Sequence, residues 1–167
     1  MNVTEIALVP KVLSPKLVRV ISKILANHLQ PYLNAIISPQ QCAFIPGRQV
    51  QDNIFIAHKA FHSLKIRRAI SIFEMGLKLD MNKAYDRIEW DFLQAVLLKM
   101  GFEETWVQKV MNCVSLVEFY VIINGKTEGG FKPSRGIRQG DPISPYLFII
   151  VNDVLSSMLN HAAARGF

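Results

Sequence analysis

At 167 residues and 50% apolar content, the chain is long enough to bury one core and gives no reason to expect two full domains. Its only cysteines, Cys42 and Cys113, stand 71 positions apart without a partner at zinc spacing, which excludes a disulfide framework or a zinc knuckle. The formal charge of +6 lies entirely in the first half: residues 1–76 carry nine Lys or Arg and three acids, whereas residues 77–167 carry ten of each.

In chain order, the first predicted helix covers residues 14–29, with Ser14 as its cap, Pro15 in its first turn and a break near Pro31. It is expected to pack by one face, formed by its apolar residues Leu17, Ile21, Ile24, Leu25 and Leu29. A turn-rich stretch separates it from a second amphipathic helix over residues 50–64, where apolar residues recur at spacings of four and three. His58 and His62 lie one turn apart on this helix, but they lack the glutamate of a metalloprotease motif, so we expect a solvated flank.

Residues 76–80 form a candidate strand, and helices are expected over residues 89–100, with Gly101 as a stop, and over residues 106–114. A strand over residues 119–123 precedes Asn124-Gly125, a pair typical of a tight hairpin turn. A loop over residues 136–142 leads to a last helix over residues 144–161. The pattern predicts a helix-rich α+β fold with a short antiparallel sheet.

No apolar run approaches the length of a membrane span, and the first ten residues lack the cationic opening of a signal peptide. We therefore expect an intracellular protein, nuclear or cytoplasmic and not secreted, with no membrane partner. The basic first half is compatible with a polyanionic partner such as nucleic acid.

Asp80 closes the short apolar run, with Tyr85 and Asp86 five and six residues later. A carboxylate at a strand end can bind a metal ion, although two-metal phosphoryl transfer needs more than one carboxylate. The alternative is a helix cap or a loop acceptor, and we expect Asp86 or Asp91 to cap the helix that follows.

A second group of candidates lies in the glycine-bounded loop after Arg135, where Arg138 and Gln139 precede the start of a helix. Such a loop can approach a phosphate or a base closely, and the alternative is a well-capped structural loop. A basic cluster consists of Lys65, Arg67 and Arg68. It could contact the phosphates of a nucleic-acid backbone, and the alternative is an ordinary exposed helix end.

Taken together and in order, three motifs resemble the reverse transcriptase domain of non-LTR (LINE-type) retrotransposons over about residues 6–167. They are Ser38-Pro-Gln-Gln-Cys-Ala-Phe-Ile-Pro-Gly-Arg48, Lys78-Leu-Asp-Met-Asn-Lys-Ala-Tyr-Asp-Arg-Ile-Glu-Trp90 and Arg135-Gly-Ile-Arg-Gln-Gly-Asp-Pro-Ile-Ser-Pro-Tyr-Leu-Phe148. The resemblance implies a right-hand polymerase fragment, with fingers over residues 1–76 and a partial palm over residues 77–167. It also implies templated DNA synthesis on an RNA template with a DNA primer, deoxynucleoside triphosphates and Mg²⁺ or Mn²⁺.

Residue by residue, Asp80 is similar to the first metal-binding aspartate, and the backbone of Met81 to a second metal contact. Tyr85 is similar to the ring beneath the incoming sugar. The remaining nucleotide-binding candidates are Gln139 and Gly140 of the loop and Arg48 of a finger motif. From their charge and position we also expect nucleic-acid contacts at Lys65, Arg67, Arg68, Arg135 and Arg138. Asp86 and Asp141 match the family pattern and are expected to shape their loops.

Two departures separate this chain from the family pattern. A segment that family members carry is deleted at the Val18–Arg19 junction, and no Asp-Asp pair occurs in the 167 residues. Without the other carboxylates we expect this truncated copy to be inactive on its own. The alternatives are a non-catalytic nucleic-acid-binding remnant and a non-functional relic.

Overall fold

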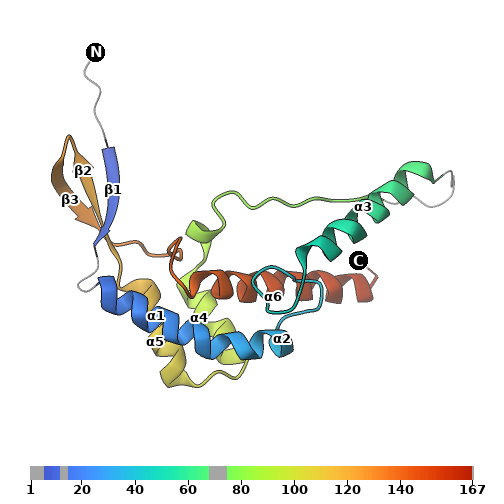
Figure 1. Ribbon diagram of the computed structural model, residues 1–167, viewed down its shortest axis with the longest axis horizontal. Coiled ribbons are helices and arrows are strands. Elements are labelled where there is room, and N and C mark those ends of the chain that lie inside the picture. Colours follow the sequence, from blue (N-terminus) through green and yellow to red (C-terminus); the bar gives the residue numbers. More distant parts are fainter. Residues whose placement is uncertain (1–5, 12–14, 68–74, 167) are drawn as a thin grey trace, which may run out of the picture.

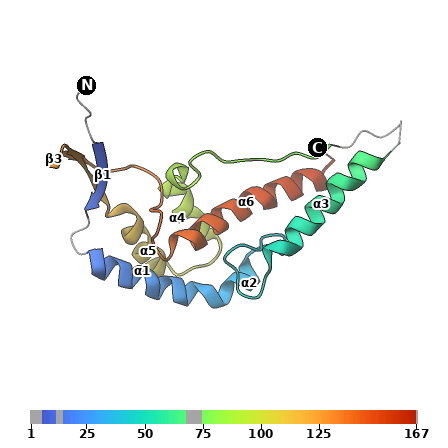
Figure 2. The same ribbon diagram turned by 45° about the horizontal axis from the view of Figure 1, so that its top comes forward.

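The computed structural model describes residues 6–11, 15–67 and 75–166, which form the expected helix-rich α+β structure with one small sheet. The sheet lies at one end of the molecule, and helix α3 (Val50–Ile66) projects at the other (Figure 1). In both views helix α6 (Ser144–Ala164) crosses the middle of the molecule (Figures 1 and 2).

The sheet is antiparallel, with the order β1-β2-β3: β1 (Ile6–Lys11), β2 (Glu118–Ile123) and β3 (Lys126–Phe131). The predicted hairpin turn between β2 and β3 is confirmed, because Asn124 and Gly125 both have positive φ, 50° and 78°. A type I′ turn requires this conformation. The sequence patterns did not predict β1, whose partner strand lies more than a hundred residues further along the chain.

The core lies among α1 (Pro15–Leu29), α4 (Trp90–Lys99), α5 (Glu104–Ser115) and α6. These helices confirm the predictions within a few residues; Ser14, the predicted first cap, lies outside the described residues. Shorter helical turns follow α1 and precede α4: η1 (Gln30–Tyr32), α2 (Leu33–Ile36) and η2 (Tyr85–Arg87). The fully buried side chains include Leu29, Leu33, Leu93, Leu97, Val110 and Leu147.

Helix α1 buries a different face from the one that its apolar residues suggested. Leu25 and Leu29 are buried as expected, but Leu17 and Ile24 are 56% and 48% exposed. The buried stripe instead includes the small residues Ser22 and Ala26. Ser22 is buried because its hydroxyl binds Asp141 and the backbone N–H of Ile143, so contacts with distant segments decide which face of α1 is buried.

The predicted strand over residues 76–80 is wrong for the part of the chain that the structure describes. These residues are extended and exposed, and no described strand lies beside them. A strand needs a hydrogen-bonded neighbour, which an apolar run alone does not supply.

Helix α3 confirms the predicted helix over residues 50–64, but none of its residues is buried. Phe55 and Ile56 are 71% and 67% exposed, and His58 and His62 are exposed, as expected for a solvated flank.

The expectation that Asp86 or Asp91 caps helix α4 is wrong. Glu89 is the residue at the cap position, and its side chain makes no capping hydrogen bond.

Both halves of the sequence contribute to the sheet and to the core. Helix α1 runs without interruption through Val18 and Arg19, the site of the expected deletion. The division into fingers and palm at residue 76 stays a prediction.

By length and composition alone, α6 is the one helix in the described ranges that could cross a membrane, with a mean hydropathy of 1.3 over its apolar window. A core helix satisfies the same criterion, but only 17% of that window is buried, including Leu147, Ile149 and Ile150. One helix of this kind is therefore weak evidence for a membrane span.

Candidate functional site

The loop after Arg135 is bound to the segment around Tyr85, which joins two of the three sequence motifs. The backbone N–H of Gly136 donates to the carbonyl of Ile88 at 2.7 Å, and that of Ile137 donates to the carbonyl of Tyr85 at 2.9 Å. The Trp90 indole N–H donates to the carbonyl of Gly136 at 2.7 Å. Three hydrogen bonds thus hold the loop against the segment.

Gly136 is required at this junction. It has φ of 93°, and a Cβ there would lie 3.1 Å from the carbonyl oxygen of Asp86. A side chain would therefore meet both backbone strain and a steric contact with fixed backbone. Beside it, Arg135 forms an exposed ion pair with Glu89 at 3.0 Å.

Asp141 anchors the other end of the loop. It is 5% exposed, and its Oδ2 accepts a hydrogen bond from Arg138 Nη2 at 2.6 Å. Its Oδ1 accepts the hydroxyl hydrogen of Ser22 and lies 3.4 Å from the backbone nitrogen of Ile143. A buried carboxylate needs such donors, so Asp141 shapes the loop, as expected, and ties it to α1.

Cys113 lies near this carboxylate. Burial, followed by the negative charge of Asp141, raises the pKa of the Cys113 thiol. Cys113 and Cys42 are both free and buried, so they form no disulfide with each other.

Tyr85 packs its ring against α6. Its ring centroid lies 5.0 Å from that of Phe148, and the two planes differ by 13°. Burial raises the pKa of the Tyr85 hydroxyl, so it stays protonated at neutral pH. This stacking adds a side-chain contact between the two joined motifs.

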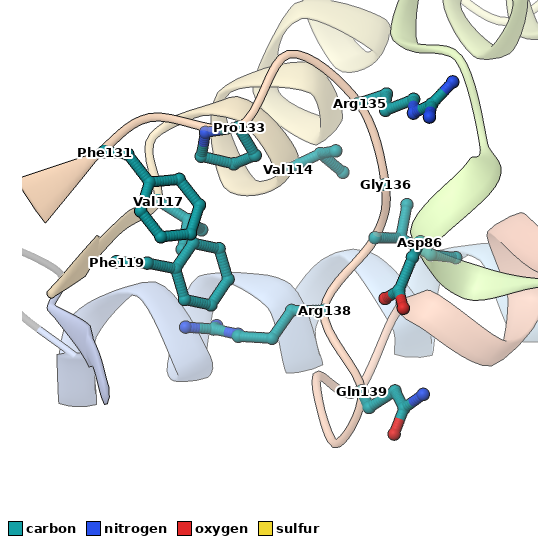
Figure 3. A pocket seen from close by; sticks show the side chains of 11 residues that line it. Asp86, Val114, Val117, Phe119, Phe131, Pro133, Arg135, Gly136, Arg138 and Gln139 are labelled. Carbon is teal, nitrogen blue, oxygen red and sulfur yellow. The ribbon is translucent and has the colours of Figure 1, made fainter. Parts of the chain in front are cut away.

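A cleft of about 580 Å³ opens beside the loop (Figure 3). Apolar side chains from the sheet and α5 form one wall, where Phe119 and Phe131 stack at 5.5 Å. Arg138, Gln139 and the carboxylate of Asp86 line the polar side. An apolar wall with a few polar groups is typical of a ligand-binding cleft. The sequence patterns missed the aromatic wall, because it depends on β3 pairing with β2.

Asp80 lines a different cavity, of about 660 Å³, with Met81 beside it and α6 opposite. The structure therefore places Asp80 and Gln139 in separate cavities. Among the described residues no group of three or more His, Cys, Asp or Glu side chains is arranged to hold a metal ion. In that part of the chain Asp80 does not belong to a set of ligands that would fit two metal ions.

Arg48 is engaged by the chain itself. Its Nη1 donates to the carbonyls of Ser38 and Gln41 at 2.6 and 2.7 Å. Its Nη2 donates to the carbonyls of Asn34 and Ile37, and its Nε to Asn34 Oδ1. These bonds use all five guanidinium N–H groups, so Arg48 fixes the turn after α2.

Asp153 on α6, to which the sequence assigned no role, holds the same turn. Its carboxylate accepts hydrogen bonds from the backbone N–H and the hydroxyl of Ser38. Asp153 and Ser38 are 115 positions apart, so no local sequence pattern predicts this contact.

The five basic residues expected to contact nucleic acid are in different situations. Lys65 and Arg67 lie at the exposed end of α3, and Arg68 lies outside the described residues. Arg135 and Arg138 are ion-paired to Glu89 and Asp141, whereas Gln139 and Gly140 are exposed at the loop tip.

Comparison with known proteins agrees with the three motifs. The family model described as "Reverse transcriptase (RNA-dependent DNA polymerase)" matches residues 10–165. The retrovirus-related Pol polyprotein from the type-2 retrotransposable element R2DM of Drosophila melanogaster is 33% identical over 140 residues, covering 83% of this chain and 13% of the polyprotein. An uncharacterized 149 kDa protein of transposon TX1 from Xenopus laevis is 29% identical over 130 residues, which are 78% of this chain and 10% of that protein.

An uncharacterized mitochondrial protein of Arabidopsis thaliana is 54% identical over 50 residues, covering 29% of this chain and 41% of that protein. The chain thus spans about a tenth of the length of the transposon proteins it matches. The match over residues 10–165 covers nearly the whole chain, and the chain belongs to the reverse transcriptase (RNA-dependent DNA polymerase) family, of the non-LTR retrotransposon type.

Proposed function

We propose that this chain supplies the fingers, over residues 1–76, and part of the palm, over residues 77–167, of a reverse transcriptase. Its partners are then an RNA template, a DNA primer and deoxynucleoside triphosphates. The observation that carries the proposal is the junction between the loop after Arg135 and the segment around Tyr85. This junction brings two motifs of the family together around one cleft.

Within this proposal, Gln139 and Gly140 contact the incoming nucleotide or the template. Both are exposed at the tip of a loop whose base is fixed by Asp141. Gly140 has φ of 84° and no atom within 4 Å of the position of a Cβ, so its surroundings leave room for a ligand. Tyr85, whose ring stacks on that of Phe148, supports the sugar side of the same substrate.

The family depends on divalent metal ions, and Asp80 with the backbone of Met81 is the proposed contact point for Mg²⁺ or Mn²⁺. One carboxylate binds such an ion weakly, because tight sites use several oxygen ligands. No Asp-Asp pair occurs in the 167 residues to add more. We therefore propose that the chain alone binds a primed template but does not extend it.

Equilibrium binding of a fluorescent DNA primer annealed to an RNA template tests the binding role, measured by anisotropy over a salt series. The proposal expects the logarithm of the association constant to fall linearly with the logarithm of salt concentration, since phosphate contacts release counterions. No binding near physiological salt would contradict it.

A charge change at Gln139 tests whether the nucleic acid contacts this loop. Gln139→Glu is expected to weaken binding of the primed template by roughly threefold or more, because it places a carboxylate against the phosphates of the nucleic-acid backbone. Gln108→Glu is the matched control on the exposed side of α5 and should leave binding unchanged. Equal effects from the two variants would place the nucleic acid elsewhere.

A further inference from the structure

The buried polar side chains among the described residues lie where the end of the loop after Arg135 meets α1. They are Ser22, Asp141 and Ser144. Ser22 is 0% exposed, and its hydroxyl donates to Asp141 Oδ1 and accepts a hydrogen bond from the backbone N–H of Ile143 at 3.2 Å. The backbone N–H of Ser144 donates to the carbonyl of Asp141, also at 3.2 Å. A satisfied buried polar network of this kind holds the groups that it joins in one arrangement.

This network ends at the turn that carries Gln139 and Gly140 (Figure 3). The backbone N–H of Asp141 closes the turn on the carbonyl of Arg138 at 3.4 Å. Gly140 supplies a positive φ of 84°, a conformation that glycine adopts without strain. The Arg138 guanidinium joins the same two corners a second time, because it donates to Asp141 Oδ2 at 2.6 Å. The turn is thus closed twice, and the carboxylate that closes it is bound to α1.

We propose that Ser22 is a positioning residue for this turn and acts through Asp141. Its hydroxyl fixes one oxygen of the carboxylate, and the other oxygen binds Arg138 and so fixes the turn. Arg138 is then a positioning residue as well: its side chain is 21% exposed, and its charge is paired with Asp141 and not with a phosphate. Helix α1 therefore determines where Gln139 meets its substrate. This role rests on the proposed contact of Gln139 and Gly140 with the template or the nucleotide.

Hydrogen exchange of the whole chain without nucleic acid tests the positioning itself. Ser22→Ala is expected to raise the exchange rates of the Ile143 and Asp141 amides about fivefold or more, since the first loses its acceptor and the second loses the anchor of its turn. Ser22→Cys keeps a side chain of similar size but offers only a weak thiol donor, so it should have the same effect. Ser156→Ala is the matched control, because the Ser156 hydroxyl binds the carbonyl of Asn152 in its own helix; both amides should stay protected.

Anisotropy of a labelled DNA primer on its RNA template, over a salt series, tests the consequence for binding. Ser22→Ala and Ser22→Cys are expected to lower the association constant about fivefold at every salt concentration. The slope of its logarithm against the logarithm of salt concentration should not change, because no phosphate contact is lost. In the Ser22→Ala chain, Gln139→Glu should weaken binding less than it does in the unsubstituted chain, since the two residues act on one contact.

The same salt series separates the two roles open to Arg138. Arg138→Met combined with Asp141→Asn removes both charges of the pair and keeps the net charge of the chain. A positioning arginine leaves the slope unchanged in this double variant. An arginine that contacts a phosphate would lower the magnitude of the slope by about one.

Unchanged exchange of the Ile143 and Asp141 amides in Ser22→Ala would overturn the positioning role. So would a Ser22→Cys chain that behaves like the unsubstituted one, because packing alone would then explain the serine. Binding of the primed template with equal affinity by the unsubstituted and Ser22→Ala chains would overturn this role alone and leave the proposed function standing. No binding by the unsubstituted chain would instead overturn the proposed function, and the role of Ser22 in binding with it.

Discussion

Removing the Asp141 carboxylate should destabilise the protein more than any other single change in the loop. Asp141→Ala leaves the Arg138 guanidinium without its ion pair and the Ser22 hydroxyl without its acceptor. The Asp141 and Arg138 side chains are only 4% and 21% exposed, so water replaces these partners incompletely.

Breaking one side of a buried ion pair costs about 3–5 kcal/mol of unfolding free energy. The partial exposure of Arg138 places the expected loss near the lower end, about 3 kcal/mol. For a chain of this size, that loss corresponds to a fall in Tm of roughly 6–12 °C.

Urea unfolding followed by circular dichroism measures this loss, in a double-mutant cycle with Arg138→Met. The double variant should lose less unfolding free energy than the sum of the losses of the two single variants. Each single variant leaves the other charged side chain without its partner, whereas the double variant removes both charges. A loss below about 1 kcal/mol for Asp141→Ala, or strict additivity, would refute the buried ion pair.

Three further changes test the junction and the turn. Gly136→Ala should cost about 1–3 kcal/mol, and more than Gly140→Ala, because both have positive φ but only the first meets the backbone of Asp86; equal losses in urea unfolding would contradict this. Arg48→Lys should lose about 2 kcal/mol and expose the turn after α2 to hydrogen exchange, since three ammonium donors replace five; unchanged protection would contradict it. The pKa of Tyr85 is raised above 10.0 in the folded protein, so its contribution to stability is present below pH 10 and is lost as pH rises through the folded pKa. Tyr85→Phe should remove that part of the decline in the unfolding free energy above pH 10, and an unchanged decline would contradict it.

The sequence predicted those elements whose causes are local. The Asn124-Gly125 turn depends on two adjacent residues with positive φ, and the last helix depends on periodicity and on Ser144-Pro145. The strand over residues 76–80 was wrong because strand formation depends on a neighbour. The buried face of α1 was wrong in part because Ser22 packs towards Asp141, which lies 119 residues away.

The candidate site was predicted in its parts but not in its arrangement. The motifs identified the loop after Arg135 and the segment around Tyr85, and the hydrogen bonds of Gly136 show how the two are held together. The sequence could not show that the Arg48 guanidinium donates hydrogen bonds to backbone carbonyls of its own chain. Nor could it show that Asp80 and Gln139 line separate cavities. These facts follow from contacts between distant segments.

Primer extension tests the central claim most directly, with the purified 167-residue chain, a labelled DNA primer on an RNA template, four deoxynucleoside triphosphates and Mg²⁺ or Mn²⁺. The account predicts that the primer is bound but not lengthened, because Asp80 lacks the further carboxylates that two-metal transfer requires. Primer extension that disappears in Asp80→Ala would contradict it.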